Sequence, residues 1–112
     1  MSDCLFCKMG SGEIKPDVVY EDEQLLAFRD IHPQAPLHVL IIPKRHVANL
    51  NDLDDALLGG QMLQTAAKIA GQLGYADSGY RTVFNCNGDG GQTVHHLHLH
   101  LLAGRQMHWP PG

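Results

Sequence analysis

Four of the eight histidines in this chain lie within six residues, in the segment from Val94 to Leu102 that reads VHHLHLHLL. On a β-strand, His96, His98 and His100 would project from one face and leucines from the other, because side chains alternate along a strand. A buried imidazole needs partners for both ring nitrogens and titrates near neutral pH, so these three residues (the histidine row) would fill a core poorly. The segment therefore predicts a strand with one apolar face and one face available for chemistry.

A glycine-rich loop, Asn87 to Thr93, comes directly before the histidine row. Its glycines let backbone N–H groups come close to an anion such as phosphate. The alternative is a plain hairpin turn, for which Asn-Gly and Asp-Gly pairs are common. Beside a row of histidines, the loop favours a phosphate site.

Residue chemistry leaves three uses of the histidine row open. Neighbours such as His96 and His98 have Cα atoms about 6.6 Å apart on a strand, so two can share a metal, and three only if the strand bends. The row can instead bind phosphate, with the central imidazole attacking phosphorus while its neighbours hold oxygens. That nucleophile must be neutral, with its N–H held by an acceptor, for which we expect a backbone carbonyl. A satisfied structural cluster is the third use.

Length, charge and cysteine content narrow the class of protein. A chain of 112 residues predicts one domain with a modest core, to which a second copy would add. The net charge of −4, without a run of Lys or Arg, argues against a nucleic-acid partner. No apolar stretch approaches the ~18 residues of a membrane span, and we expect no secretory leader. Three cysteines, an odd number, fit a cytoplasmic protein better than a disulfide scaffold.

Periodicity and turn residues predict five strands and one long helix. The strands are expected at 18–20, 25–28, 38–42, 80–86 and 94–102. A helix is expected at 52–73, begun by Asn51 or Asp52 and ended by Gly74. Its apolar residues recur at helical spacing: Leu53, Leu57, Leu63, Ala67 and Ala70.

Cys4 and Cys7 have the C-x₂-C spacing with which two thiolates bind one tetrahedral zinc ion. A redox pair is disfavoured, because no βαβ unit surrounds them. Chance spacing without any metal is the remaining alternative.

The residues from His96 to Leu102 match the His-φ-His-φ-His-φ-φ signature of the histidine triad (HIT) superfamily, where φ is apolar. Four further stretches resemble its Hint branch, the histidine triad nucleotide-binding proteins, so that nearly the whole chain is covered: 28–36 with His38, 42–46, 90–93 and 104–112. The last stretch separates this branch from the dinucleotide-hydrolase and decapping branches. The resemblance implies a single HIT domain over 1–112, with an α+β fold. A five-stranded antiparallel sheet, one long helix and a short N-terminal helix would form each subunit of a homodimer.

The resemblance also implies an enzyme, a purine nucleoside phosphoramidase that needs no organic cofactor. It would hydrolyse adenosine or guanosine 5′-monophosphoramidates to the nucleoside monophosphate and an amine, through a nucleotidyl-histidine intermediate. Two alternatives stay open. One is a purine-nucleotide-binding regulatory protein with little turnover, and the other is a module that binds zinc through the histidine row itself.

By matching position, the resemblance assigns roles to individual residues. His98 would be the nucleophile, and His100 would bind phosphate and assist departure of the amine. His96 and His38 would orient the row, and Thr93 would complete the catalytic group as a phosphate contact. Asp30 would hold the ribose hydroxyls, and Trp109 would reach the partner's active site. The remaining nucleotide contacts would come from Phe6, Met9, Ile14, Phe28, Arg29, Ile31, Leu40, Asn85, Gly91 and Gln92.

Three departures from the family pattern bear on these roles. Thr93 stands where Ser is common, and His95 replaces a usual Tyr, for which we expect a packing role. The Cys4 and Cys7 pair is absent from many Hint-branch members. Zinc-containing relatives in the wider superfamily complete such a site with residues that match His46 and His96, so a structural zinc ion is expected here.

Overall fold

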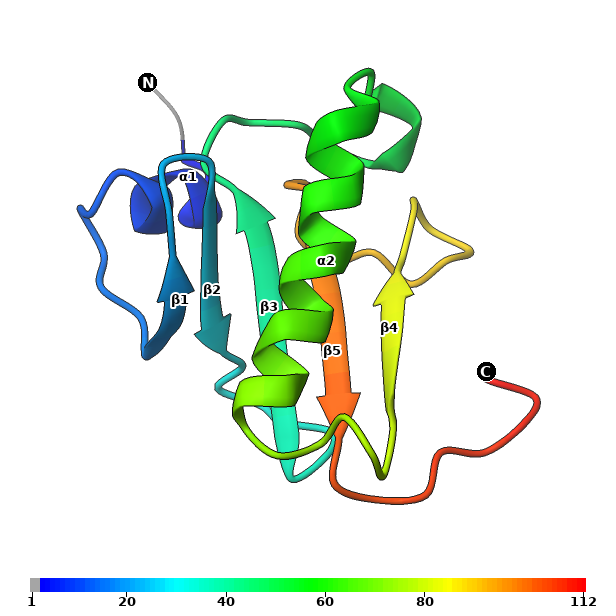
Figure 1. Ribbon diagram of the computed structural model, residues 1–112. Helices are drawn as coiled ribbons and strands as arrows, with labels where there is room; N and C mark the ends of the chain where they lie inside the picture. Colours follow the sequence, from blue (N-terminus) through cyan, green and yellow to red (C-terminus); the bar gives the residue numbers. More distant parts are fainter. Residues whose placement is uncertain (1–2) are drawn as a thin grey trace.

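The computed structural model describes residues 3–112, and in them a five-stranded antiparallel sheet lies beneath one long helix (Figure 1). The strand order is β1-β2-β3-β5-β4, and every neighbouring pair is antiparallel. The expected α+β fold, with one long and one short helix, is therefore confirmed. Its elements are α1 (Leu5–Gly10), β1 (Val18–Glu21), β2 (Leu25–Arg29), β3 (Leu37–Pro43), a 3₁₀ turn (Leu50–Asp52), α2 (Ala56–Gln72), β4 (Tyr80–Phe84) and β5 (Leu99–Ala103).

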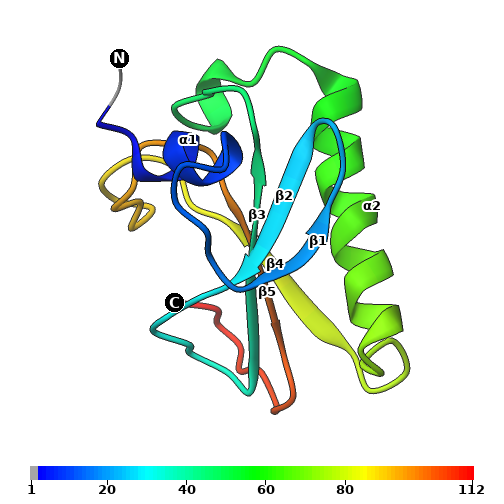
Figure 2. The same ribbon diagram turned by 90° about the vertical axis from the view of Figure 1, so that its left-hand side faces the viewer.

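The two helices cover opposite faces of the sheet, as the edge-on view in Figure 2 shows. All seven residues of β3 are buried, because it is the central strand and both of its faces are covered. Val39 and Ile41 pack in the larger cluster under α2. Leu40 and Ile42 face the other way, into a smaller cluster that includes Phe6 of α1. The α1 face is the one that carries the site described below.

Helix α2 begins later than the sequence predicts and buries a different face. Its N-cap is Asp55, whose carboxylate accepts from the N–H of Leu58 at 3.1 Å, while the residues just before it form the separate 3₁₀ turn. Leu57 and Leu63, expected on the apolar side, are 70% and 48% exposed. The buried face has the same spacing and keeps Ala70 of the expected set: Leu58, Met62, Thr65, Ala66, Ile69 and Ala70. Gly74, with φ +90°, follows the C-cap as expected.

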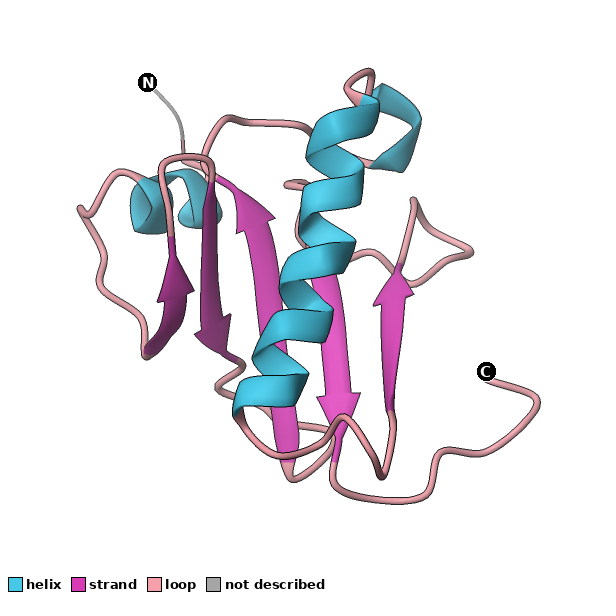
Figure 3. Ribbon diagram, in the orientation of Figure 1, coloured by secondary structure: helices cyan, strands magenta, loops and turns pink. Residues whose placement is uncertain are grey.

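The histidine row is less regular than expected. Strand β5 begins at Leu99 instead of Val94, and β4 ends at Phe84 instead of Cys86, so only His100 of the row lies in a strand. Figure 3 shows the segment before β5 as loop. There the N–H of Leu97 donates to the carbonyl of Val47 at 2.6 Å, a contact outside the strand ladder. The chain bends at this point, which sends His96 and His98 to different partners.

None of the helices in residues 3–112 is long and apolar enough to cross a lipid bilayer.

Candidate functional site

The His98 ring is held by the backbone of its own segment. Its Nδ1 lies 2.7 Å from the carbonyl oxygen of His96, and because a carbonyl can only accept, Nδ1 carries the proton. The lone pair is therefore on Nε2. Phe6 packs edge-on against the ring at 5.2 Å between centroids, and His98 is only 8% exposed. The expected carbonyl acceptor is confirmed, and the ring has the protonation that a nucleophile needs.

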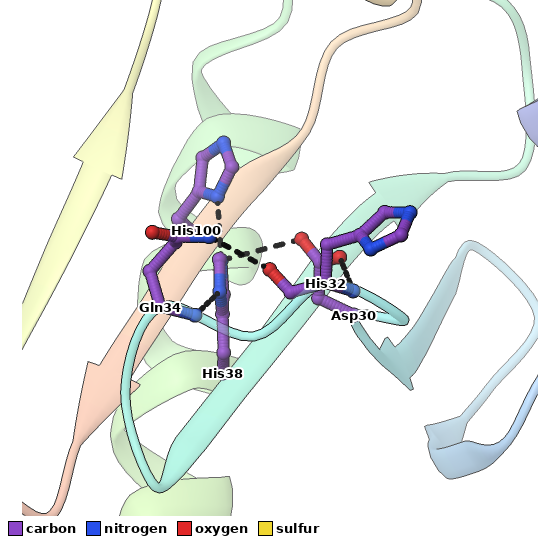
Figure 4. Close-up of polar contacts among 5 residues, drawn as sticks. All are labelled: Asp30, His32, Gln34, His38 and His100. Carbon is purple, nitrogen blue, oxygen red and sulfur yellow. Dashed lines mark hydrogen bonds and ion pairs between the residues drawn. The ribbon is translucent and has the colours of Figure 1, made fainter.

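A chain of hydrogen bonds fixes the proton of His100 (Figure 4). The backbone N–H of Gln34 donates to Nδ1 of His38 at 3.0 Å, so the proton of His38 lies on Nε2. That nitrogen is 2.9 Å from Nδ1 of His100, which therefore accepts. The proton of His100 must then lie on its Nε2. Two neighbouring histidines thus have complementary forms, with a lone pair on Nε2 of His98 and an N–H donor on Nε2 of His100.

Both members of the His38–His100 pair are neutral at pH 7. Burial, together with the neighbouring rings of His98 and His38, lowers the pKa of His100 to about 4. Burial also lowers the pKa of His38, although the Asp30 carboxylate opposes this. Asp30 Oδ2 lies 3.5 Å from Nε2 of His38, and its Oδ1 accepts from the N–H of His32 at 2.8 Å. Asp30 therefore lies beside the pair, while the ring of His32 points away from it (Figure 4).

The depressed pKa of His100 predicts acid-sensitive folding. An unfolded chain binds a proton at this histidine below its ordinary pKa of 6.5, whereas the folded chain does so only near 4. The free energy of unfolding should therefore fall as the pH decreases through this window. Because solvent partly screens the ring, we expect His100→Gln to reduce the stability difference between pH 7 and pH 5 by about 1 kcal/mol. Urea unfolding at both pH values measures this difference in the free energy of unfolding. The exposed His95 is the control, and an equal effect of His95→Gln would contradict the assignment.

The glycine-rich loop is held by Gln92, which is 7% exposed. Its side-chain oxygen accepts from the N–H of Asn87 at 2.9 Å, and its amide nitrogen donates to the carbonyls of Ala48 and Val94 at 2.9 and 3.0 Å. The backbone N–H of Gln92 is also used, in a bond to the carbonyl of Asn87. We expected Gln92 to contact the nucleotide, but these groups are already engaged. These bonds hold the shape of the loop, and the nucleotide contact of Gln92 stays a prediction.

Gly90 is the position in this loop where a side chain is excluded. A Cβ atom there would lie 2.5 Å from the carbonyl oxygen of Cys86 and 2.8 Å from its nitrogen. We expect Gly90→Ala to destabilise the fold by about 2 kcal/mol, because backbone must move, and to weaken anion binding at the loop. Gly88→Ala is the matched control, since a Cβ there meets nothing within 4 Å. Urea unfolding and nucleotide titration measure both effects, and equal results for the two variants would contradict this reading.

The structure brings together only part of the expected purine pocket. Phe6, Phe28 and Leu40 share the cluster beneath α1, and Met9 packs against it. The outer members are at the surface: Ile31 is 86% exposed, Ile14 is 36% exposed, and Arg29 pairs with Asp17. Gly91 and Thr93 are exposed on the loop and Asn85 is half-buried. Trp109 is 80% exposed, and the single chain does not bring it to the site.

Four expected metal ligands meet at one point beside the histidine row. Nδ1 of His96 lies 3.2 Å from Sγ of Cys4 and 3.4 Å from Sγ of Cys7. Nδ1 of His46 lies 3.4 Å from Sγ of Cys7 and 3.3 Å from Nδ1 of His96. A tetrahedral zinc ion with bonds of about 2.0–2.3 Å separates its ligand atoms by about 3.3–3.8 Å. The cluster therefore has the dimensions of a zinc site.

The position of one proton supports this reading. Nε2 of His96 donates to the carbonyl of Pro43 at 2.8 Å, which leaves the lone pair on Nδ1, the atom that faces the cysteines. Asp30, His38 and His100 form a second group with ligand atoms close enough to bind a metal. There, however, a hydrogen bond already occupies the space between the two imidazoles. The donor chemistry fits a metal in the first cluster and disfavours one in the second.

Some of these contacts could not be read from the sequence. His95 is exposed, so the expected packing role is not seen in the single chain. The peptide of Gln34 and the amide of Asn49, which donates to the side chain of Asn87 at 3.1 Å, were missed. Neither carries a motif, because both act through contacts that only the fold creates.

Comparisons with known proteins agree on one family. Residues 11–107 match the model of the HIT domain. The chain is 48% identical to a purine nucleoside phosphoramidase of Escherichia coli, over 94% of this chain and 90% of that one. It is 52% identical to an uncharacterized HIT-like protein of Synechococcus elongatus, over 98% and 97% of the two chains. A crystal structure of a HIT family hydrolase from Legionella pneumophila is similar at a TM-score of 0.96 and 57% identity, covering 98% of this chain and all of that one.

Proposed function

The chain belongs to the HIT domain family of hydrolases, and we propose that it is a purine nucleoside phosphoramidase. The bond cleaved would be the P–N bond between an amine and the phosphate of a purine nucleoside monophosphate. The observation that carries this proposal is the pair of complementary imidazoles, with a lone pair on His98 Nε2 and an N–H on His100 Nε2. A nucleophile beside a neutral donor suits attack on a phosphate that bears negative charge.

In the first step, Nε2 of His98 attacks phosphorus and forms an N–P bond as the P–N bond to the amine breaks. The amine takes one proton from solvent and leaves. Nδ1 keeps its proton throughout, because the His96 carbonyl holds it. The N–H of His100 would donate to a phosphate oxygen and stabilise its charge.

In the second step, water attacks the phosphorus of the nucleotidyl-histidine. The bond to His98 breaks, the nucleoside monophosphate leaves, and water gives one proton to solvent. That proton replaces the one taken by the amine, so the cycle balances with the consumption of one water molecule. His98 returns to its neutral form, with its proton still on Nδ1.

The nucleotide would lie on the α1 face of the sheet. Phe6, Phe28 and Leu40 offer an apolar wall for the purine, and the Asp30 carboxylate offers acceptors for the ribose hydroxyls. Asn85 and Thr93 border the phosphate position. The proposed pocket therefore runs from α1, across the end of β2, to the glycine-rich loop.

The covalent intermediate provides the test. The protein is mixed briefly with adenosine 5′-phosphoramidate, quenched and examined by intact-mass spectrometry. We expect a mass increase of one adenylyl group that maps to His98 and decays to adenosine monophosphate. The same treatment of His98→Asn should give no adduct. Nucleotide binding without adduct or turnover would instead indicate a regulatory binding protein.

We also propose that the cluster of Cys4, Cys7, His46 and His96 binds a zinc ion. Two thiolates and two imidazoles are a donor set that this ion favours. The ion would link the start of α1 to the segment that carries His98, without taking part in the chemistry.

A homodimer is the third part of the proposal. Strand β4 is an edge of the sheet, and Leu57 and Leu63 are exposed apolar side chains on α2. Trp109 is also exposed, and a large indole is a common interface anchor. Sedimentation of the intact protein tests this part, and a monomer at micromolar concentration would contradict it.

A further inference from the structure

We propose that Arg105 is a positioning residue for His100, acting through the backbone of Gln34. This inference rests on the proposed function, in which the N–H of His100 Nε2 donates to the substrate phosphate. It adds a residue at the start of the C-terminal tail to the machinery that sets the protonation of the site. Neither the histidine row nor the glycine-rich loop contains this residue.

Hydrogen bonds reach the backbone of Gln34 from both sides, and the N–Cα–C bonds of this residue join them. Nε of Arg105 donates to the carbonyl of Gln34 at 3.1 Å. The N–H of Gln34 donates to Nδ1 of His38 at 3.0 Å, and Nε2 of His38 lies 2.9 Å from Nδ1 of His100. The tail thus binds the carbonyl of Gln34, and the N–H of Gln34 binds His38. Figure 4 shows the hydrogen bonds that lead from Gln34 through His38 to His100.

The loop has few other ways to supply this bond. Pro33 and Pro36 have no N–H, so within residues 33–36 only Gln34 and Ala35 can donate from the backbone. The tail also supports the loop by close packing. A Cβ on Gly104 would lie 2.8 Å from Cβ of Pro36, and the φ of Gly104 is +96°. The start of the tail therefore rests directly on the loop that sets His38.

The form of His38 decides the form of His100. The N–H of Gln34 and the Asp30 carboxylate, 3.5 Å from Nε2 of His38, both favour a proton on that nitrogen. If the N–H of Gln34 moves away, one of these two constraints is lost, and the proton can shift to Nδ1 so that Nε2 accepts. His100 would have to donate from Nδ1, which leaves a lone pair on its Nε2. A lone pair there repels the phosphate oxygen that an N–H would bind. Loss of the Arg105 contact should thus reduce turnover through a change in tautomer.

A structural role for Arg105 in holding the tail is the competing explanation, and the chain offers a matched control. Nη2 of Arg81 donates to the carbonyl of His108 at 3.0 Å, so it holds the same tail without touching the loop. A second control is Gln34→Ala. This variant removes the side-chain bond to the His32 carbonyl but keeps the backbone N–H and the backbone carbonyl of residue 34.

The experiment measures the tautomers directly, by ¹⁵N imidazole NMR of the intact, metal-loaded protein at pH 7. In the wild type and both controls we expect His38 and His100 to be protonated on Nε2. In Arg105→Ala we expect shifts averaged between the two tautomers, with a five- to tenfold fall in kcat on adenosine 5′-phosphoramidate and little change in KM. Arg105→Lys, which retains one donor, should recover part of both losses.

Wild-type tautomers in Arg105→Ala would overturn the inference, whatever its kcat. The same tautomer change in Arg81→Ala would also overturn it, because the effect would then belong to the tail as a whole. The NMR result does not depend on turnover. A wild-type protein that fails to cleave phosphoramidates would contradict the proposed function, while the tautomer comparison would still decide the role of Arg105.

Discussion

His98→Asn is expected to lower kcat on adenosine 5′-phosphoramidate by about four orders of magnitude, because it removes the attacking nitrogen. The amide of Asn can still donate to the His96 carbonyl. It therefore replaces in part the 2.7 Å hydrogen bond that Nδ1 of His98 donates to this carbonyl. The base and ribose contacts that we propose lie elsewhere, so affinity for adenosine monophosphate should change by no more than about threefold. Steady-state kinetics and calorimetric titration measure the two quantities.

His100→Gln is the companion variant. It should slow the reaction and leave measurable turnover, since it removes a donor to phosphate and keeps the nucleophile. A His98 variant that turns over at the wild-type rate would exclude the proposed mechanism. A loss of nucleotide affinity equal to the loss in kcat would show that His98 supports the pocket instead.

Much of the fold was predictable because strong local patterns agree with it. The buried runs in β3 and β2 coincide with the apolar segments expected at 38–42 and 25–28. Gly74 ends α2 because a positive φ suits glycine. The helix face was wrong in part, because two apolar sets with helical spacing overlap in the sequence: Ala70 is buried as expected, whereas Leu57 and Leu63 are exposed.

The histidine row shows where sequence reasoning stops. Alternation predicted a regular strand from Val94, but the bond from Leu97 to Val47 and the ring-to-carbonyl bond of His98 replace the ladder there. The residue types of the site were nevertheless predictable, because imidazoles beside a glycine-rich loop suit phosphate chemistry. The protonation of each ring was not, since it depends on contacts such as the one from Gln34, which belongs to a separate loop.

Cys4→Ser is expected to remove the metal and to lower the melting temperature by about 10 °C or more, because metal binding adds directly to the stability of the folded state. The substitution separates the loss of the metal ligand from any loss of the helix cap. Cys4 is the N-cap of α1, where its Sγ accepts from the N–H of Cys7 at 3.2 Å. Serine is a strong N-cap residue, so the helix start should survive while the thiolate is lost. Elemental analysis should give about one zinc per wild-type chain and almost none in the variant.

A second cysteine variant is the control for the thermal melts. Cys86→Ser removes the third cysteine, which is outside the cluster, and should keep both the zinc and the melting temperature. Metal-free wild type and metal-free Cys4→Ser should melt together, because the difference between them lies in the ion. Since Phe6 of α1 packs against the ring of His98, loss of the ion should also weaken nucleotide binding. Wild-type protein that melts at the same temperature with and without metal would contradict a structural role for the site.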